Sequence, residues 1–284
     1  MNDRSAWFVS TEWLARHLAD SGVVVVDGTW HLAVTGRDGR KEYDAGHIPG
    51  AVFFDIDAIA DTANPLPHML PTADVFAKAV GQLGTDAKQT IVVYDGVGLS
   101  SAPRVWWTFK VMGAADVVIL DGGLPKWKAE GRPVDTAPVA RPPRWFDAHL
   151  DPAVVKNLAD VRRGIDTGAF QLVDARPAAR FRGEAPEPRP WVKTGRVPGS
   201  RNVPSTELIA DGRLKDPEVL RAAFAAGGVD LAKPIVTSCG SGVNAATLSL
   251  ALDVLGVKGT SLYDGSWTEW GARDDTPIAT GTDC

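Results

Sequence analysis

The chain contains the same series of motifs twice, and this repetition constrains its fold more than any other feature. Four motifs recur in the same order, offset by 143 to 149 residues. They are 23–27 with 171–174, 46–51 with 195–200, 91–96 with 235–240, and 121–123 with 264–266. A repeat of about half of a 284-residue chain indicates two copies of one domain rather than a short-period solenoid.

A proline-rich stretch separates the two copies. It contains Pro133, Pro138, Pro142 and Pro143. Such a segment cannot continue a helix and is typical of an extended linker. We therefore expect a first domain at 1–138, a linker at 139–149 and a second domain at 150–284.

Short apolar runs alternate with helical periods inside each copy. The runs at 91–94 and 117–120 are typical of buried strands, and residues 101–113 and 243–255 are typical of the helices between strands. This alternation predicts two α/β domains, each with a parallel β-sheet flanked by helices on both faces. Sites in such sheets form at the carboxyl ends of the strands.

The composition excludes several classes of function. The net charge of −5 argues against a nucleic-acid-binding surface, which needs a concentrated basic patch. No apolar run is long enough to span a membrane, and the first residues lack the apolar core of a signal peptide, so we expect a cytoplasmic protein. The two cysteines, Cys239 and Cys284, fit a reducing compartment and form no CxxC pair, so no metal site is expected.

Cys239 lies in a segment that is suited to hold negative charge. It follows a predicted strand and precedes the helix expected from 243, and Gly240 and Gly242 allow the backbone to curl tightly. A curled backbone can turn several N–H groups inward, and a helix N-terminus adds partial positive charge. A thiol there is expected to react as a thiolate rather than to pack as a small apolar residue. Asp95 holds the equivalent position in the first copy, so one active site, in the second copy, is expected.

Two further motifs resemble signatures of the rhodanese family of sulfurtransferases. Residues 43–51 resemble the N-terminal signature, and residues 263–270 resemble the C-terminal one. Family members with two tandem domains have one active cysteine, in the second domain, and an aspartate in its place in the first. Cys239 and Asp95 match that pattern. The resemblance implies that sulfur is carried as a Cys239 persulfide, without a metal or organic cofactor.

The loop 239–245 resembles that of one subfamily. Its sequence is Cys-Gly-Ser-Gly-Val-Asn-Ala, similar to the Cys-Gly-Ser-Gly-Val-Thr-Ala of 3-mercaptopyruvate sulfurtransferases. The resemblance implies that four loop residues bind substrate: Gly240, Gly242, Val243 and Asn244. Thiosulfate sulfurtransferases usually carry an arginine after the cysteine, and phosphatases of this fold need an arginine at the position of Ala245.

The resemblance also implies roles for residues outside the loop. Arg180 and Arg189 match the family's substrate arginines, and arginine suits a carboxylate because its planar fork forms two parallel hydrogen bonds. Ser241, His68 and Asp57 match a proton relay in which Ser241 touches the substrate, His68 orients or deprotonates Ser241, and Asp57 fixes the tautomer of His68. The residues alone leave other interpretations open: a solvated basic loop, a helix-capping serine and a surface histidine.

The implied reaction moves sulfur from 3-mercaptopyruvate to a thiol acceptor such as thioredoxin, or to cyanide, and releases pyruvate. Thiosulfate:cyanide sulfur transfer on the same scaffold is the first alternative. The second is a non-catalytic rhodanese-like module that binds a partner or senses oxidants through Cys239.

Overall fold

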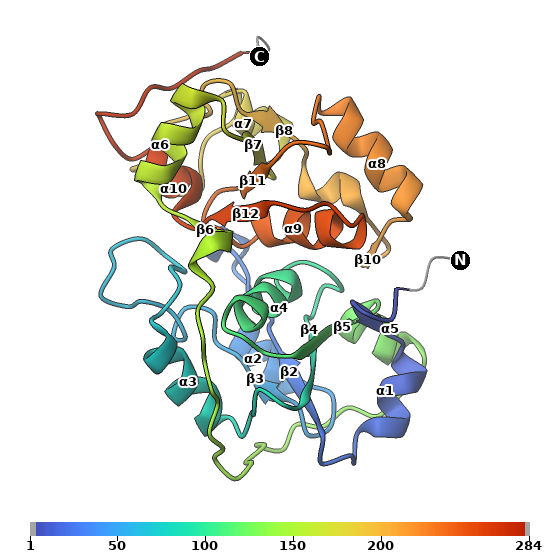
Figure 1. The fold of residues 1–284 in the computed structure, drawn as a ribbon. Coiled ribbons are helices and arrows are strands. Elements are labelled where there is room, and N and C mark those ends of the chain that lie inside the picture. Colours follow the sequence, from blue (N-terminus) through green and yellow to red (C-terminus); the bar gives the residue numbers. More distant parts are fainter. Residues whose placement is uncertain (1–3, 282–284) are drawn as a thin grey trace. The chain divides into compact units, whose positions relative to one another are not determined.

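The computed structural model describes residues 4–281 and divides the chain into two units (Figure 1). The first unit takes residues up to 62, 70–151 and 211–213, and the second takes 63–69, 152–210 and the residues from 214 onward. Residues 63–69 precede the linker in the sequence, yet their contacts assign them to the second unit. Within residues 4–281, none of the helices has both the length and the apolar character needed to cross a membrane. Cys284 lies outside the described residues.

The first unit is built on a five-stranded parallel sheet with the order β1-β5-β4-β2-β3. Its strands are β1 (Phe8–Val9), β2 (Val23–Asp27), β3 (Val52–Phe53), β4 (Thr90–Tyr94) and β5 (Asp116–Leu120). The three central strands are the Val- and Ile-rich runs of the sequence. β-branched side chains pack well on a pleated surface that is covered on both faces, which explains why these runs form the buried middle of the sheet.

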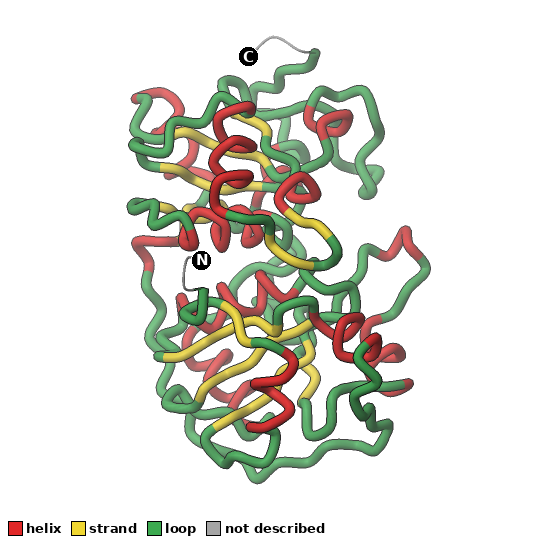
Figure 2. The backbone as a smooth tube through the Cα atoms, turned by 90° about the vertical axis from the view of Figure 1, so that its right-hand side faces the viewer, coloured by secondary structure: helices red, strands yellow, loops and turns green. Residues whose placement is uncertain are grey.

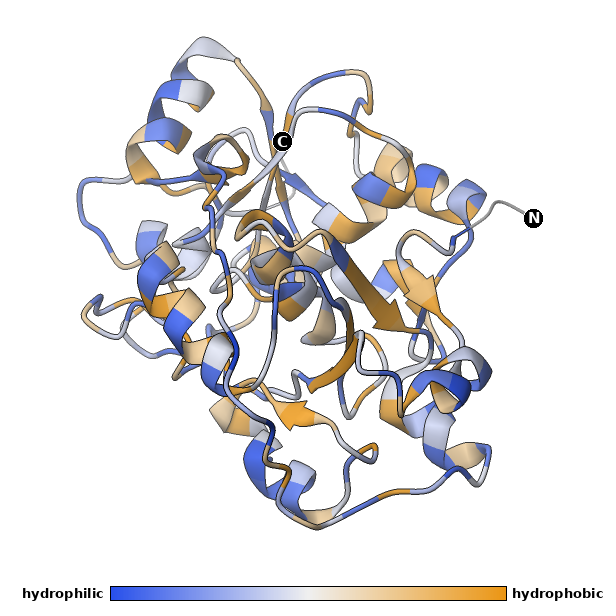
Figure 3. Ribbon diagram, turned by 60° about the horizontal axis from the view of Figure 1, so that its bottom comes forward, coloured by the Kyte–Doolittle hydropathy of each residue, from blue (hydrophilic) through white to orange (hydrophobic). Residues whose placement is uncertain are grey.

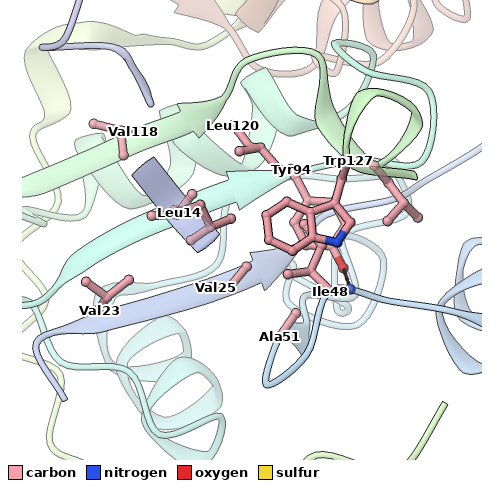
Figure 4. Packing of buried hydrophobic residues seen from close by; sticks show 11 residues of the cluster. Leu14, Val23, Val25, Ile48, Ala51, Tyr94, Val118, Leu120 and Trp127 are labelled. Carbon is pink, nitrogen blue, oxygen red and sulfur yellow. Dashed lines mark hydrogen bonds between the residues drawn. The ribbon is translucent and has the colours of Figure 1, made fainter. Parts of the chain in front are cut away.

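One face of this sheet packs against α1 (Thr11–His17) and α5 (Gly123–Ala129). Leu14 and Trp127 come from these helices, and Val25 and Tyr94 point to them from the strands (Figure 4). The Trp127 indole N–H donates to the Pro133 carbonyl, so this large buried ring leaves no polar atom unsatisfied.

Other helices bring aromatic side chains into the unit. These helices are α3 (Ala73–Gln82) and α4 (Ala102–Val111). Another helix of the unit, α2 (Gly39–Ala45), follows the short 3-10 turn Ala33–Thr35. Phe76 of α3 and Phe109 of α4 form a buried aromatic cluster with Phe54 and Phe146. The hydropathy colouring of Figure 3 shows apolar strands, and helices that carry both hydrophilic and hydrophobic residues.

The second unit repeats the architecture with the order β6-β12-β11-β7-β8, again all parallel. Its strands are β6 (Val155–Lys156), β7 (Gln171–Asp174), β8 (Arg201–Asn202), β11 (Ile235–Ser238) and β12 (Thr260–Tyr263), and β9 (Ile209–Ala210) pairs with β10 (Arg213–Leu214) outside this sheet. Its helices are α6 (Leu158–Thr167), α7 (Ala178–Phe181), α8 (Pro217–Ala226), α9 (Ala245–Val254) and α10 (Ser266–Trp270), with 3-10 turns at Pro152–Val154 and Ser205–Leu208. Figure 2 shows strands between helices in both units.

The predicted fold class is confirmed: each unit is a parallel five-stranded sheet flanked by helices. The two sheets share one spatial order, which is the structural counterpart of the sequence repeat. Residues 138–151 form neither helix nor strand. The helix expected from 243 begins at Ala245, because residues 239–244 are used by the loop before it.

Candidate active site

Cys239 lies at the carboxyl end of the central strand of the second sheet. β11 ends at Ser238, and the loop 239–244 leads into α9, for which Asn244 is the N-cap. The cysteine is 3% exposed, so its surroundings are largely shielded from water. Electrostatic interactions are stronger in such an environment than in solvent.

The backbone of the cysteine loop is held by the first turn of α10. The Cys239 N–H donates to Ser266 Oγ (3.1 Å), and the Cys239 carbonyl accepts from the Trp267 N–H (2.9 Å). The Gly240 carbonyl accepts from both the N–H and the hydroxyl of Thr268, at 2.8 and 2.6 Å. These bonds leave the later amides of the loop for another acceptor.

The equivalent loop of the first unit shows what such amides can hold. The Asp95 carboxylate accepts five backbone N–H bonds at 2.7–2.9 Å, from Val97, Gly98, Ser100, Ser101 and Ala102. Asp95 is itself fully buried. The loop therefore stabilises a negative group with backbone dipoles alone, without a basic side chain hydrogen-bonded to that carboxylate among the described residues.

The matching amides of the second unit lie 144 residues further along the chain. Within residues 4–281, the N–H groups of Ser241, Asn244 and Ala245 donate to no protein acceptor. Gly242 has φ 82°, and Gly98 of the first loop has φ 120°. Both values fall in the left-handed region that glycine enters without a steric penalty, and there each glycine lets its loop curl.

Arg180 lies against this loop. It belongs to α7, and a Cβ atom added to Gly240 would stand 3.2 Å from its guanidinium nitrogen Nη2. The guanidinium donates to Glu187 through Nε (3.2 Å) and Nη2 (2.5 Å). The Arg180 side chain keeps 17% exposure, against 4% for that of Glu187. The absence of a side chain at Gly240 therefore leaves room for the Arg180 guanidinium beside the residue that follows Cys239.

Glu187 also links Arg180 to a buried ion pair, that of Arg176 with Asp174. Arg176 donates to both Asp174 and Glu187, and its Nη2 also donates to the Gly195 carbonyl. Burial alone would lower the pKa of Arg176, but the Asp174 and Glu187 carboxylates beside it raise that pKa above its ordinary value. The buried carboxylates thereby keep two arginines in fixed positions.

Arg189 lies near His68, on the segment 63–69 of the same unit. The Arg189 Nη2 and His68 Nε2 atoms are 3.5 Å apart. This contact places the Arg189 guanidinium beside one ring nitrogen of His68. His68 is buried and has φ 63°, a conformation that costs a non-glycine residue roughly 1–3 kcal/mol.

Similarity to known proteins shows the family of this chain. The family model "Rhodanese-like domain" matches residues 10–130 and 157–273. The chain belongs to the rhodanese-like family. It is 45% identical over 277 residues to the 3-mercaptopyruvate sulfurtransferase of Escherichia coli K12, covering 96% of this chain and 98% of that protein. It is 42% identical over 270 residues to the thiosulfate sulfurtransferase of Cricetulus griseus, covering 92% and 91%. The crystal structure of SseA from Escherichia coli, described as a 3-mercaptopyruvate sulfotransferase, has a TM-score of 0.86 at 42% identity and covers 92% of this chain and 99% of its own.

The structure brings some of the predicted residues of this rhodanese-like chain together. Arg180 contacts the loop that carries Cys239, and His68 and Arg189 meet in the same unit. Asp57 belongs to the first unit, where its carboxylate accepts from the Trp30 indole N–H at 2.9 Å. Its predicted effect on His68 thus remains a prediction.

The start of α9 bears on one alternative interpretation of the rhodanese-like loop, that Ser241 is a helix cap. The N-cap of α9 is Asn244 rather than Ser241, so the serine is not a helix cap. Asn244 makes no side-chain capping hydrogen bond, because its backbone is already helical, with φ −72° and ψ −19°.

Sequence reasoning missed Glu187, Ser266 and Thr268. An acid seven residues after Arg180 in a proline-rich loop was a signal for a pairing partner of that arginine. Ser266 and Thr268 lie in the C-terminal signature, but nothing in their spacing shows that they bond to a loop 27 residues earlier. Among residues 4–281, no cluster of three His, Cys, Asp or Glu side chains is arranged to bind a metal ion.

Proposed function

We propose that the chain is a sulfurtransferase that takes sulfur from 3-mercaptopyruvate onto Cys239 and passes it to a thiol such as thioredoxin, or to cyanide. The observation that carries this proposal is the pair of equivalent loops. In the first unit the loop amides hold the Asp95 carboxylate. The same loop in the second unit carries a cysteine, whose persulfide is also an anion that needs hydrogen-bond donors.

The reaction proceeds in two transfers. The Cys239 thiolate attacks the sulfur of the donor, the carbon–sulfur bond breaks, and its electron pair remains on carbon as the pyruvate enolate. A proton delivered through Ser241 or water converts the enolate to pyruvate. The acceptor thiolate then attacks the outer sulfur of the persulfide and releases the Cys239 thiolate, so a covalent intermediate divides one difficult transfer into two.

Arg180 and Arg189 are the proposed carboxylate anchors of the donor. Arg180 lies at the loop of the cysteine and retains some exposure. The buried Glu187 fixes its guanidinium, which reduces the entropy lost on binding. His68, with Nε2 toward Arg189, is proposed to orient or deprotonate Ser241, with Asp57 fixing its tautomer. We expect this reaction to take place in the cytoplasm.

The choice of donor rests on the loop rather than on overall similarity. The chain is 45% identical to the 3-mercaptopyruvate sulfurtransferase and 42% identical to the thiosulfate sulfurtransferase, so overall identity hardly separates the two activities. The segment 239–245 contains no charged residue, as in the mercaptopyruvate subfamily that it resembles. Rates of turnover with the two donors separate the two activities. We expect the higher kcat/KM with 3-mercaptopyruvate, and a preference for thiosulfate would favour the alternative.

The central test is the Cys239→Ser variant with intact-mass measurement after donor treatment. The wild-type protein should gain the mass of one sulfur atom and lose it on addition of a thiol, whereas the variant should show neither the gain nor turnover. A wild-type protein that gains no sulfur would instead support a binding or redox-sensing module. Turnover by the variant would exclude Cys239 as the carrier.

A second test removes an anchor. Arg189→Ala should lower kcat/KM for 3-mercaptopyruvate roughly 10–100-fold, because a charged hydrogen bond contributes about 1.5–3 kcal/mol. Arg182→Ala is the matched control, since Arg182 is a nearby arginine that pairs with the exposed Glu184. Equal values of kcat/KM for the two variants would show that Arg189 does not bind the donor.

A further inference from the structure

Ser266 occupies a conformation that serine rarely adopts. It is the first residue of α10, is fully buried and has φ 51°. Among residues 4–281, only two other non-glycine residues, His68 and Asp211, have a positive φ. A left-handed backbone at such a residue costs roughly 1–3 kcal/mol and persists only where the surroundings impose it.

The first unit has glycine at the equivalent position. Gly123 lies 143 residues earlier and has φ 54°, close to the value for Ser266. A Cβ atom on Gly123 would stand 2.8 Å from the Asp95 carbonyl oxygen and from Gly98 Cα, so no side chain fits there. The backbone conformation is thus common to both units, whereas the hydroxyl is found only in the unit that carries the cysteine.

The Ser266 hydroxyl connects the cysteine to the end of the neighbouring strand. It accepts from the Cys239 N–H at 3.1 Å and donates to the Tyr263 carbonyl at 2.8 Å. The Cys239 carbonyl is held by the Trp267 N–H at 2.9 Å. Both polar backbone atoms of Cys239 are therefore bonded to residues that begin α10.

We propose that Ser266 is a positioning residue, whose hydroxyl fixes the Cys239 backbone so that the sulfur faces the amides of Ser241 and Asn244. Peptide groups held on both sides of a residue set the direction of its Cα–Cβ bond, which limits the sulfur to the few staggered positions about that bond. Glycine would adopt φ 51° without strain but could not accept the Cys239 N–H. Both units adopt this conformation, but only the serine is strained in it, and its hydroxyl holds the Cys239 backbone in place. The catalytic consequence rests on the proposed function, but the orientation of Cys239 does not.

Two substitutions at this position separate positioning from folding. Ser266→Gly relieves the backbone but leaves the buried Cys239 N–H without its acceptor, and each effect is worth roughly 1–3 kcal/mol, so they offset one another. We expect a melting temperature close to that of the wild type but a kcat about 5–10-fold lower, the effect of one lost hydrogen bond. KM for the donor should stay within about twofold, because the arginines are untouched. Ser266→Thr keeps the hydroxyl but places a β-branched residue at positive φ, so the melting temperature should fall while kcat is largely kept.

The direct readout is alkylation of Cys239 by iodoacetamide, followed by peptide mass spectrometry across pH 5–9. We expect the pH dependence of the Cys239 alkylation rate to differ from that of the wild type in Ser266→Gly and to match it in Ser266→Thr. Asp211→Gly is the control, since it relieves another left-handed residue, one that is exposed. It should leave both alkylation and kcat unchanged.

Two outcomes would overturn the proposal. One is wild-type alkylation and kcat in Ser266→Gly, which would make the hydroxyl irrelevant to the sulfur. The other is a parallel loss of melting temperature and kcat in that variant, which would indicate a structural role only. If Ser266→Thr fails to fold, the glycine variant still decides. Failure of the proposed function would appear separately, as turnover by Cys239→Ser, and the alkylation profile would still test Ser266.

Discussion

Replacing Asp95 by asparagine tests the physical idea on which the active loop depends. One carboxylate oxygen accepts from two backbone N–H groups, those of Val97 and Gly98, and the other accepts from three. Asparagine has a single acceptor oxygen, so its NH₂ group must face one of these two sets. The better orientation turns the NH₂ group toward the pair and leaves two donors without an acceptor, the buried N–H of Gly98 and the partly buried N–H of Val97.

The cost follows from that count. An unsatisfied buried donor costs about 1–3 kcal/mol, and the three remaining bonds also lose the assistance of a formal charge. We therefore expect Asp95→Asn to destabilise the first unit by about 4 kcal/mol. That is a large share of the roughly 5–15 kcal/mol that stabilises a typical domain.

Urea unfolding followed by hydrogen–deuterium exchange, read on peptides from each unit, measures this loss. Two units need not unfold together, so the exchange of β4 peptides rather than a single global transition should be followed. Asp20→Asn, at an exposed aspartate, should change stability by less than about 0.5 kcal/mol. A cost below about 1 kcal/mol for Asp95→Asn would refute the idea that these amides hold negative charge strongly, and with it the argument for the persulfide.

Three further predictions concern buried charges and the loop. Glu187→Gln removes the buried carboxylate that Arg176 and Arg180 share, so we expect a loss of about 3–5 kcal/mol in unfolding free energy and a higher KM for the donor. Urea unfolding measures the first effect and steady-state kinetics the second. An unchanged KM would mean that Glu187 does not fix Arg180. Gly240→Ala would place a methyl group 3.2 Å from the Arg180 guanidinium, so KM should rise while melting temperature changes little, and an unchanged KM would argue against Arg180 as an anchor. Burial raises the pKa of Asp27 from an ordinary 3.8 to about 6, so the folded state binds its proton more tightly, and the stability contributed by this group is complete below pH 4 and lost as pH rises through 6. The difference in unfolding free energy between Asp27→Asn and the wild type should therefore depend on pH. It should favour the variant by up to about 3 kcal/mol more at pH 8 than at pH 4. A difference that stays constant over this range would contradict a raised pKa for Asp27.

Local patterns in the sequence were enough to predict the fold and the loop that holds Cys239. The runs at 23–27 and 91–94 form central strands because β-branched residues in short apolar segments favour a sheet covered on both faces, and the repeat required a second sheet of the same order. Cys239 could be located because strand end, glycine loop and helix start are adjacent in the chain, and local patterns report neighbours in sequence.

The distant groups that meet at that loop could not be predicted from the order of the residues and are seen in the folded chain alone. The approach of Arg180 to Gly240 joins segments 60 residues apart, and the bond from Cys239 to Ser266 joins two strand ends. His68 precedes the linker, yet it belongs to the second unit and meets Arg189 there. Such contacts depend on how sheets and loops pack in three dimensions, and side-chain packing and hydrogen-bond geometry leave no periodic trace in the order of the residues.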